Sequence, residues 1–300
     1  MKKHLLLIAT LFISFCTDAQ EDDLLSLLDD DSSDEINYTF GTFKGTRVIN
    51  TQSVDIQAKK ELLFIITHRF GYLNTGFDSF YGLDEANVRI GFEYGINDIW
   101  AVGIGRSGAP IDVYDGYSKL KLLRQSTGAK NMPVSVVWNA NVAVQTSDFI
   151  GAEDVDLSFA DRLFFTHQLL IARKFNKRFS FQLAPTYTHN NTLEFEAESN
   201  DTFSLGLSTR VQITKRMAVL ADYYRIFDEN FREMFEEPLA IGVEFETGGH
   251  VFQLVFTNAL GMTERVFLSR ELGSWADGDV SFGFNIQRTF PFGGRGKNIK

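Results

Sequence analysis

The stretch EFETGGHVFQLVFTNALGMTERVF, from Glu244 to Phe267, decides the fold. It reads as a strand, a tight glycine turn and a second strand, with bulky apolar residues alternating with other residue types on both sides of the turn. Alternation with a period of two places the two sets on opposite faces of a strand, which a helix would not do. One face therefore meets an apolar environment, and the other meets water or a polar interior.

The same alternation recurs in twelve segments of roughly ten residues each. They begin near Leu62, Val88, Ile99, Tyr117, Val134, Leu163, Phe179, Phe203, Met217, Leu239, Val251 and Val280. Tight turns alternate with long connections, although the turn RQSTGAKNMP is longer than the other short ones. These features predict an all-β fold, a twelve-stranded antiparallel transmembrane β-barrel. It has short periplasmic turns, long extracellular loops and both termini in the periplasm.

A soluble secreted barrel would also alternate, with its bulky face turned inward. The loop asymmetry, a glycine- and serine-rich second face, and aromatic residues at segment ends favour the membrane barrel. These aromatic residues are Trp100, Tyr187, Tyr223, Tyr224, Phe290 and Phe292. In the opening stretch we therefore expect Phe245, Phe252 and Leu254 to contact lipid, and Glu244 and Gln253 to face the lumen.

The chain is predicted to divide into four parts. Two lysines, an apolar run and the small residue Ala19 predict a signal peptide over residues 1–19, and hence export to the outer membrane. Residues 20–59 form an acidic periplasmic leader, 60–292 the barrel and 293–300 a C-terminal tail. The single cysteine, Cys16, lies in the signal peptide, so the mature protein has no disulfide or thiolate site.

The leader is strongly acidic. Residues 21–35 contain eight acidic and no basic residues, and the formal net charge of the whole chain is −10. The remainder is close to balanced, without the basic cluster that a nucleic-acid surface needs. Two interpretations stay open: a solvated, mostly disordered leader that offers a site to a periplasmic protein partner, or a plug or cap. In the second, part of residues 36–59 folds into the barrel, and Lys44 and Arg47 meet lumen acids.

Six stretches resemble an uncharacterised family of outer-membrane β-barrels, a domain of unknown function. They are TFKGTRVIN, THRFGYLNTG, FEYGIND, YDGYSKLKLLRQSTGAKNMPVSV, FTHQLLIARKF and ETGGHVFQLVFTNALGMTE. The resemblance extends over nearly the whole mature chain. It implies a single barrel surrounded by outer-membrane lipid, and it brings no substrate, cofactor or catalytic residue.

The histidines do not form a recognisable catalytic or metal site. His68 and His167 fall on the lipid-facing register near a rim, where an amphipathic ring suits the interface. Neither is followed two positions later by serine, and no GxSxG motif is present. His68, His167, His189 and His250 also lack the spacing of metal ligands. We therefore predict no catalytic residue, metal or cofactor, and a protein that is not an enzyme.

Charged residues on the inward register are the candidate functional residues. They are Arg69, Arg89, Glu93, Lys119, Lys121, Arg210, Asp222 and Glu244. Both signs are present, which fits either a network of paired charges that closes the lumen or a polar conduit for small hydrophilic solutes. The primary hypothesis is a channel for passive or gated passage of a small polar solute. The alternative is a non-transporting structural or partner-binding barrel that acts through its loops or its acidic leader.

Overall fold

A computed structural model describes residues 35–108, 110–149, 156–195, 198–228 and 230–292. The predicted signal peptide, residues 20–34 of the acidic leader and the predicted C-terminal tail lie outside the described residues. No helix in the described ranges is long and apolar enough to span a membrane.

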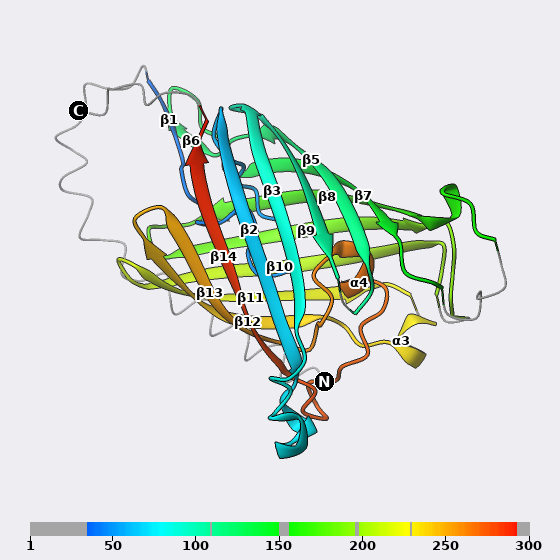
Figure 1. The fold of residues 1–300 in the computed structure, drawn as a ribbon. Helices are drawn as coiled ribbons and strands as arrows, with labels where there is room; N and C mark the ends of the chain where they lie inside the picture. The colour runs from blue at the N-terminus through cyan, green and yellow to red at the C-terminus, as the bar shows by residue number, and fades with distance from the viewer. Residues whose placement is uncertain (1–34, 109, 150–155, 196–197, 229, 293–300) are drawn as a thin grey trace, which may run out of the picture. The chain divides into compact units, whose positions relative to one another are not determined.

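Twelve antiparallel strands close into a barrel (Figure 1). In spatial order they are β10 (Asp201–Thr214), β11 (Met217–Ile226), β12 (Leu239–Thr247), β13 (His250–Thr257), β14 (Ser281–Pro291), β2 (Glu61–Tyr72), β3 (Asn87–Asn97), β4 (Trp100–Ser107), β5 (Val113–Leu123), β7 (Ser135–Gln145), β8 (Leu163–Lys174) and β9 (Phe179–Asn190). β9 pairs with β10 and closes the ring. The prediction of a twelve-stranded barrel is confirmed, and each strand begins within a few residues of the position that the alternation indicates.

Short turns lie at one rim of the barrel and long connections at the other. The turn between β12 and β13 contains Gly248 and Gly249, whose φ angles of 25° and 111° suit glycine best. The long connections contain the short helices η2 (Leu73–Thr75), η3 (Phe77–Ser79), η4 (Ala160–Arg162), α3 (Phe231–Met234) and α4 (Glu264–Phe267). Residues 35–38 and 126–131 belong to a separate small unit, in which β1 (Ile36–Tyr38) pairs with β6 (Ser126–Gly128).

Burial alternates along the strands as the sequence predicts. In β13, Phe252, Leu254 and Phe256 are exposed on the outer face, whereas Gln253 and Thr257 are buried in the lumen. The bulky face is therefore the outer one, and the polar face is the inner one. A closed sheet with this arrangement matches the pattern of outer-membrane barrels.

Of the predicted aromatic residues, Trp100, Phe290 and Phe292 are exposed, and Tyr187 and Tyr223 are partly exposed. The ring of His68 stacks on that of Phe284 at 4.9 Å, and the ring of His167 stacks on that of Trp138 at 5.8 Å. Tyr224 is the exception, because it is buried and its hydroxyl accepts a hydrogen bond from Gln168 Nε2 at 2.9 Å. Its neighbour Tyr223 takes the outward position, so the prediction that both rings lie at the interface was wrong for Tyr224.

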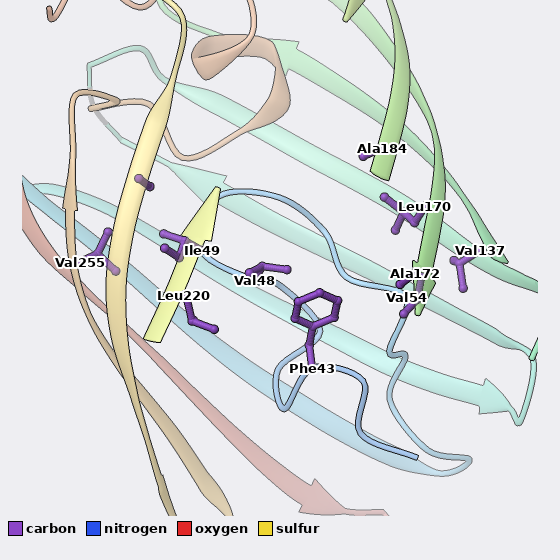
Figure 2. Packing of buried hydrophobic residues seen from close by; sticks show 11 residues of the cluster. Phe43, Val48, Ile49, Val54, Val137, Leu170, Ala172, Ala184, Leu220 and Val255 are labelled. Carbon is purple, nitrogen blue, oxygen red and sulfur yellow. The ribbon is translucent and has the colours of Figure 1, made fainter. Parts of the chain in front are cut away.

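Two segments occupy the lumen. The N-terminal insert, residues 42–57, precedes β2, and the loop insert, residues 258–274, belongs to the connection between β13 and β14. Nearly all of their residues are buried or partly buried. Figure 2 shows the apolar side chains of the N-terminal insert facing those of the strands. The cluster consists of Phe43, Val48, Ile49 and Val54 with Val137, Leu170, Ala172, Ala184, Leu220, Ala240 and Val255.

The loop insert departs from the predicted long extracellular loop. Residues 261–271 are all buried, because apolar side chains here pack against the strands. Val266 joins a cluster with Phe164, and the ring of Phe267 lies 5.6 Å from that of Tyr224. Burial of these apolar side chains favours folding of the loop insert into the barrel.

A lipid-facing substitution tests the assignment of the two faces. Leu254 is 42% exposed on the outer face and pairs with Val243 and Phe284. Leu254→Arg places a cation in the apolar belt and is expected to destabilise the barrel by about 2–4 kcal/mol. Urea titration of the barrel in lipid vesicles measures this change. Leu254→Phe is the matched control, and equal stability of the two variants would contradict the assignment.

Candidate functional site

The N-terminal insert contains a small hairpin, residues 46–53, here called the lumen hairpin. Val48 N donates to Thr51 O at 2.8 Å, and Ser53 N donates to Thr46 O at 2.9 Å. Asn50 lies in the turn, a position that asparagine favours. The hairpin forms no ladder with any barrel strand, so its remaining main-chain groups need partners from side chains.

The tip of the hairpin is held by one carboxylate. Asp222 Oδ2, on β11, accepts hydrogen bonds from the main-chain N–H groups of Ile49, Asn50 and Thr51 at 3.0, 2.8 and 3.0 Å. Successive N–H groups that converge in this way form an anion-binding concavity. Asp222 is buried, so these charge-assisted bonds supply much of the solvation that water would otherwise give the carboxylate.

Four carboxamide side chains of the wall bond to the main chain of the same segment. The bonds join Gln253 Nε2 to Val48 O (2.7 Å), Asn285 Nδ2 to Ile49 O (3.2 Å), Gln182 Nε2 to Gln52 O (2.8 Å), Val54 N to Gln182 Oε1 (3.0 Å) and Thr46 N to Gln287 Oε1 (3.1 Å). A carboxamide carries a donor and an acceptor, as a peptide group does. The wall thus supplies the partners that a neighbouring strand would supply.

The predicted lumen residues form ion pairs with one another and with other wall residues. Arg89 Nε and Nη2 donate to both carboxylate oxygens of Asp115 at 2.9 and 2.6 Å. Arg210 Nε donates to Glu244 Oε1 at 2.9 Å. Both pairs are buried, and in each the partners lie two strands apart, so the inward charges compensate one another across an intervening strand.

Glu93 and Lys119 connect the wall to the N-terminal insert. Lys119 Nζ lies 3.3 Å from Glu93 Oε2 and donates to Thr46 O at 2.6 Å. Glu93 Oε1 accepts a hydrogen bond from Gln57 N at 3.0 Å. This buried pair therefore binds main-chain groups near both ends of the insert.

The two remaining predicted residues differ in position. Arg69 is buried and donates from Nη1 to Asn285 Oδ1 at 2.9 Å and from Nη2 to Asn50 Oδ1 at 3.0 Å. Lys121 is only partly buried, beside Asp55 and Arg124. It lines a cavity of about 190 Å³ near the rim of short turns.

The two inserts meet at Glu264 of α4. Gln52 Nε2 donates to Glu264 Oε1 at 3.1 Å, and Arg47 Nη2 lies 3.8 Å from the same oxygen. Arg47 and Glu264 are both buried. At the rim, Lys44 Nζ lies 3.0 Å from Glu246 Oε2. The N-terminal insert is therefore bound to the loop insert as well as to the wall.

A second buried charge cluster holds the loop insert. Arg265 and Arg270 form ion pairs with Glu194 and Glu198 of the connection between β9 and β10, with N–O distances from 2.5 to 3.9 Å. The Arg265 guanidinium also stacks 3.8 Å from the centroid of the Phe164 ring. Burial lowers the pKa of Arg265 to about 9, while the two glutamates favour its charged form.

Selection of charged residues alone overlooked the carboxamide wall. Asp115 was overlooked because the predicted segment began near Tyr117, whereas β5 begins at Val113. Gln253, Asn285 and Gln287 lie on the inward register that the alternation already marks. Glu264 lies in a predicted loop, and no period-two signal placed it in the lumen. Among the described residues, no three His, Cys, Asp or Glu side chains gather as metal ligands.

The closed barrel agrees with a family comparison. The model of the family described as "Membrane bound beta barrel domain (DUF5777)" matches residues 43–290. The chain belongs to this family. The predicted resemblance to an uncharacterised barrel family is thereby confirmed, and the protein is a membrane-bound β-barrel of the outer-membrane type.

Solved structures of other barrels resemble the chain at low identity. The KdgM porin matches with 7% identity and a TM-score of 0.47, over 77% of this chain and 99% of that chain. The NanC porin matches with 9% identity and a TM-score of 0.48, over 76% and 98%. Acinetobacter baumannii Omp33 matches with 6% identity and a TM-score of 0.45, over 77% and 99%. No curated protein matches. None of these distant likenesses indicates what this DUF5777 barrel binds.

Loss of the Asp222 carboxylate should release the hairpin tip. A hydrogen bond to a charged group contributes about 1.5–3 kcal/mol, so Asp222→Ala is expected to weaken insertion by about 2 kcal/mol or more. The measurement is the rate at which proteinase K cuts residues 42–57 in the folded barrel. Asp112→Ala removes an equal charge from the exposed pair with Arg106 and serves as the control. Equal cutting rates in the two variants would refute the anchoring role.

The loop insert should respond to pH through Glu271. Burial raises the pKa of Glu271 from its ordinary value of 4.5 to about 8, against the stabilising effect of a hydrogen bond from the Tyr72 hydroxyl. The inserted state therefore binds the proton more tightly. Its stability is greatest below about pH 4.5 and falls as the pH rises through about 8.

Hydrogen exchange of residues 258–274 should consequently become faster between pH 5 and pH 9, after correction for the intrinsic pH dependence of exchange. Glu271→Gln should remove most of this change, because the amide does not titrate. A pH dependence that persists unchanged in this variant would show that another group is responsible.

Proposed function

We propose that this DUF5777 barrel is a gated outer-membrane channel for a small polar solute. The N-terminal insert, residues 42–57, acts as its plug and is called the plug from here on. The proposal rests on the hydrogen bonds between the barrel wall and the main chain of the plug. Asp222 and four carboxamides of the wall bond to the main chain of a segment that forms no part of the barrel sheet.

The polarity of the wall favours a lumen that becomes hydrated. Replacing buried ion pairs by well-packed apolar residues is often neutral or stabilising, so a static scaffold has no need of a charged interior. The pairs Arg89–Asp115 and Arg210–Glu244 would remain in place after the plug leaves. Water would then replace the peptide groups on Asp222 and the carboxamides, which leaves a polar path.

The plug can leave without breaking the barrel. The strand ladder closes through β9 and β10 and needs no residue of the insert. Lys60 and Ala58 mark the short connection from the plug to β2, where Lys60 N donates to Gly95 O at 2.8 Å. Withdrawal therefore requires the loss of side-chain hydrogen bonds and apolar contacts, while the interstrand bonds are kept.

A non-transporting barrel is the second candidate, and the contact between the inserts favours it. Glu264 joins the loop insert to Gln52 of the plug, so the lumen is closed from both ends. In this alternative the filled barrel serves as a scaffold, and a protein partner binds its loops or its acidic leader. The two candidates differ in whether current ever passes.

The placement of the chain in the cell completes the proposal. Residues 1–19 direct export, residues 20–41 remain in the periplasm, and 60–292 form the transmembrane barrel with the tail 293–300 on the periplasmic side. The eight predicted lumen residues line the path of the solute, and the proposed function is transport of a solute rather than catalysis. These assignments rest on the sequence patterns and on the even strand number with short turns at one rim.

Planar-bilayer conductance tests the channel directly. The full chain should carry little current, whereas replacement of residues 42–57 by a Gly/Ser run of equal length should remove one of the two segments in the lumen and raise the current. A second variant also replaces residues 261–270, because the loop insert closes the other end. A Gly/Ser replacement of residues 76–81, which are exposed or partly buried, is the control. If both folded variants, verified by heat-modifiable migration, pass no current, the channel proposal is rejected in favour of the scaffold.

A further inference from the structure

The wall recognises the plug almost entirely through its main chain. The hydrogen bonds that Asp222, Lys119, Glu93 and the carboxamides of the wall form with the plug all involve peptide N–H or C=O groups of the plug. The atoms bound are Thr46 N and O, Val48 O, Ile49 N and O, Asn50 N, Thr51 N, Gln52 O, Val54 N and Gln57 N. Main-chain groups are common to every polypeptide, so this set of contacts does not depend on the side chains of the plug.

Side-chain recognition by the wall is limited. Asn50 Oδ1 accepts a hydrogen bond from Arg69, and apolar side chains such as Val48 and Ile49 fill space near Leu220 and Val255 (Figure 2). Outside residues 46–54, Lys44 pairs with Glu246 and Gln57 Nε2 donates to Glu61 Oε2. The ion pair of Arg47 and the side-chain hydrogen bond of Gln52 go to Glu264 of the loop insert, while the Arg47 guanidinium lies 5.9 Å from the centroid of the Tyr117 ring. Selectivity for side chains is therefore mostly a matter of apolar size.

We propose that the inner wall is a binding site for an extended or hairpin polypeptide, occupied here by the chain's own residues 46–54. A second polypeptide of similar apolar content binds the same groups when the plug is displaced. This site rests on the geometry alone. If the proposed channel function also holds, a short peptide is the class of solute that the lumen accepts.

The arrangement of wall groups fits a peptide better than a saccharide. Asp222 accepts three successive main-chain N–H donors, while Gln253 and Asn285 donate to the carbonyls of Val48 and Ile49 in the same turn. Gln182 pairs with a carbonyl and an N–H two residues apart, as a neighbouring strand does. A saccharide carries hydroxyl groups and lacks this series of amide donors.

The tethered plug competes strongly with any free peptide, because a short linker gives an effective concentration in the millimolar range. The tether must therefore be cut in the folded protein. Ala58, Lys59 and Lys60 are exposed between the plug and β2, which makes this a suitable place for an inserted protease site. Cleavage leaves a barrel whose plug is held by noncovalent contacts alone and is able to exchange.

The experiment measures exchange of fluorescent peptides into the cleaved full chain in detergent. Three peptides of residues 42–57 are compared: the native sequence, a triple variant with Arg47→Ala, Asn50→Ala and Gln52→Ala, and a native sequence N-methylated at Asn50 and Thr51. The triple variant should bind within about tenfold of the native peptide. The N-methylated peptide should bind at least about tenfold more weakly, a loss of roughly 1.4 kcal/mol.

Equal binding of the N-methylated and native peptides, or no binding of the triple variant, overturns main-chain recognition. As a second format, the native peptide is added while the chain with residues 42–57 replaced by Gly/Ser refolds. Failure to bind in both formats also overturns the proposal. Binding requires no current, so a barrel that takes up peptide and never conducts would reject the channel while leaving the peptide site in place.

Discussion

The carboxylate of Asp222, buried within a closed barrel, is the constraint on which the arrangement of the lumen depends. A buried carboxylate without partners is highly unfavourable, and three main-chain N–H groups of the lumen hairpin bond to one of its oxygens. The hairpin has the reciprocal need, because a segment outside the sheet has no ladder for its peptide groups. The carboxylate and the N–H groups of the hairpin thus provide each other with hydrogen-bond partners, and this places the hairpin tip against β11.

The remaining contacts extend this principle around the barrel. Carboxamides from β9, β13 and β14 bind successive peptide groups, and Lys119 with Glu93 binds the flanks of the insert. The loop insert then closes the other side through Glu264. The structure thus combines a rigid sheet, whose bonds are independent of the lumen, with contents held by side chains. This arrangement supports the proposed gate, because the interstrand bonds do not depend on the inserts.

The sequence predicted the faces of the strands better than the contents of the lumen. Alternation alone assigns Leu254 to the outer face and Gln253 to the inner one, because each position depends only on local geometry. Pairing across strands, such as that of Arg210 with Glu244, requires the closed register, which the alternation does not specify. The buried loop insert was missed for a related reason. Its apolar residues have no strand period, and only the closed barrel shows the space that they fill.

Tyr224 illustrates the limit at a single position. An aromatic residue at a strand end suits a lipid interface, yet register places Tyr224 inside, where it bonds to Gln168 and packs on Phe267. Residue type alone predicted a lipid-interface environment for Tyr224, but only the neighbouring Tyr223 lies on the outer face. Strict use of the period-two register would have separated the two tyrosines, whereas no local rule would have revealed the carboxamide contacts with the hairpin.

Hydrogen exchange of the main-chain amides in residues 46–53, measured on the full chain in lipid nanodiscs, tests the central claim most directly. The account predicts that the amides of Ile49, Asn50 and Thr51 are protected to a degree similar to those of β11, because each donates to Asp222 inside the barrel. Exchange of these three amides at the rate of an unstructured peptide would contradict it, and would show that the hairpin does not occupy the lumen.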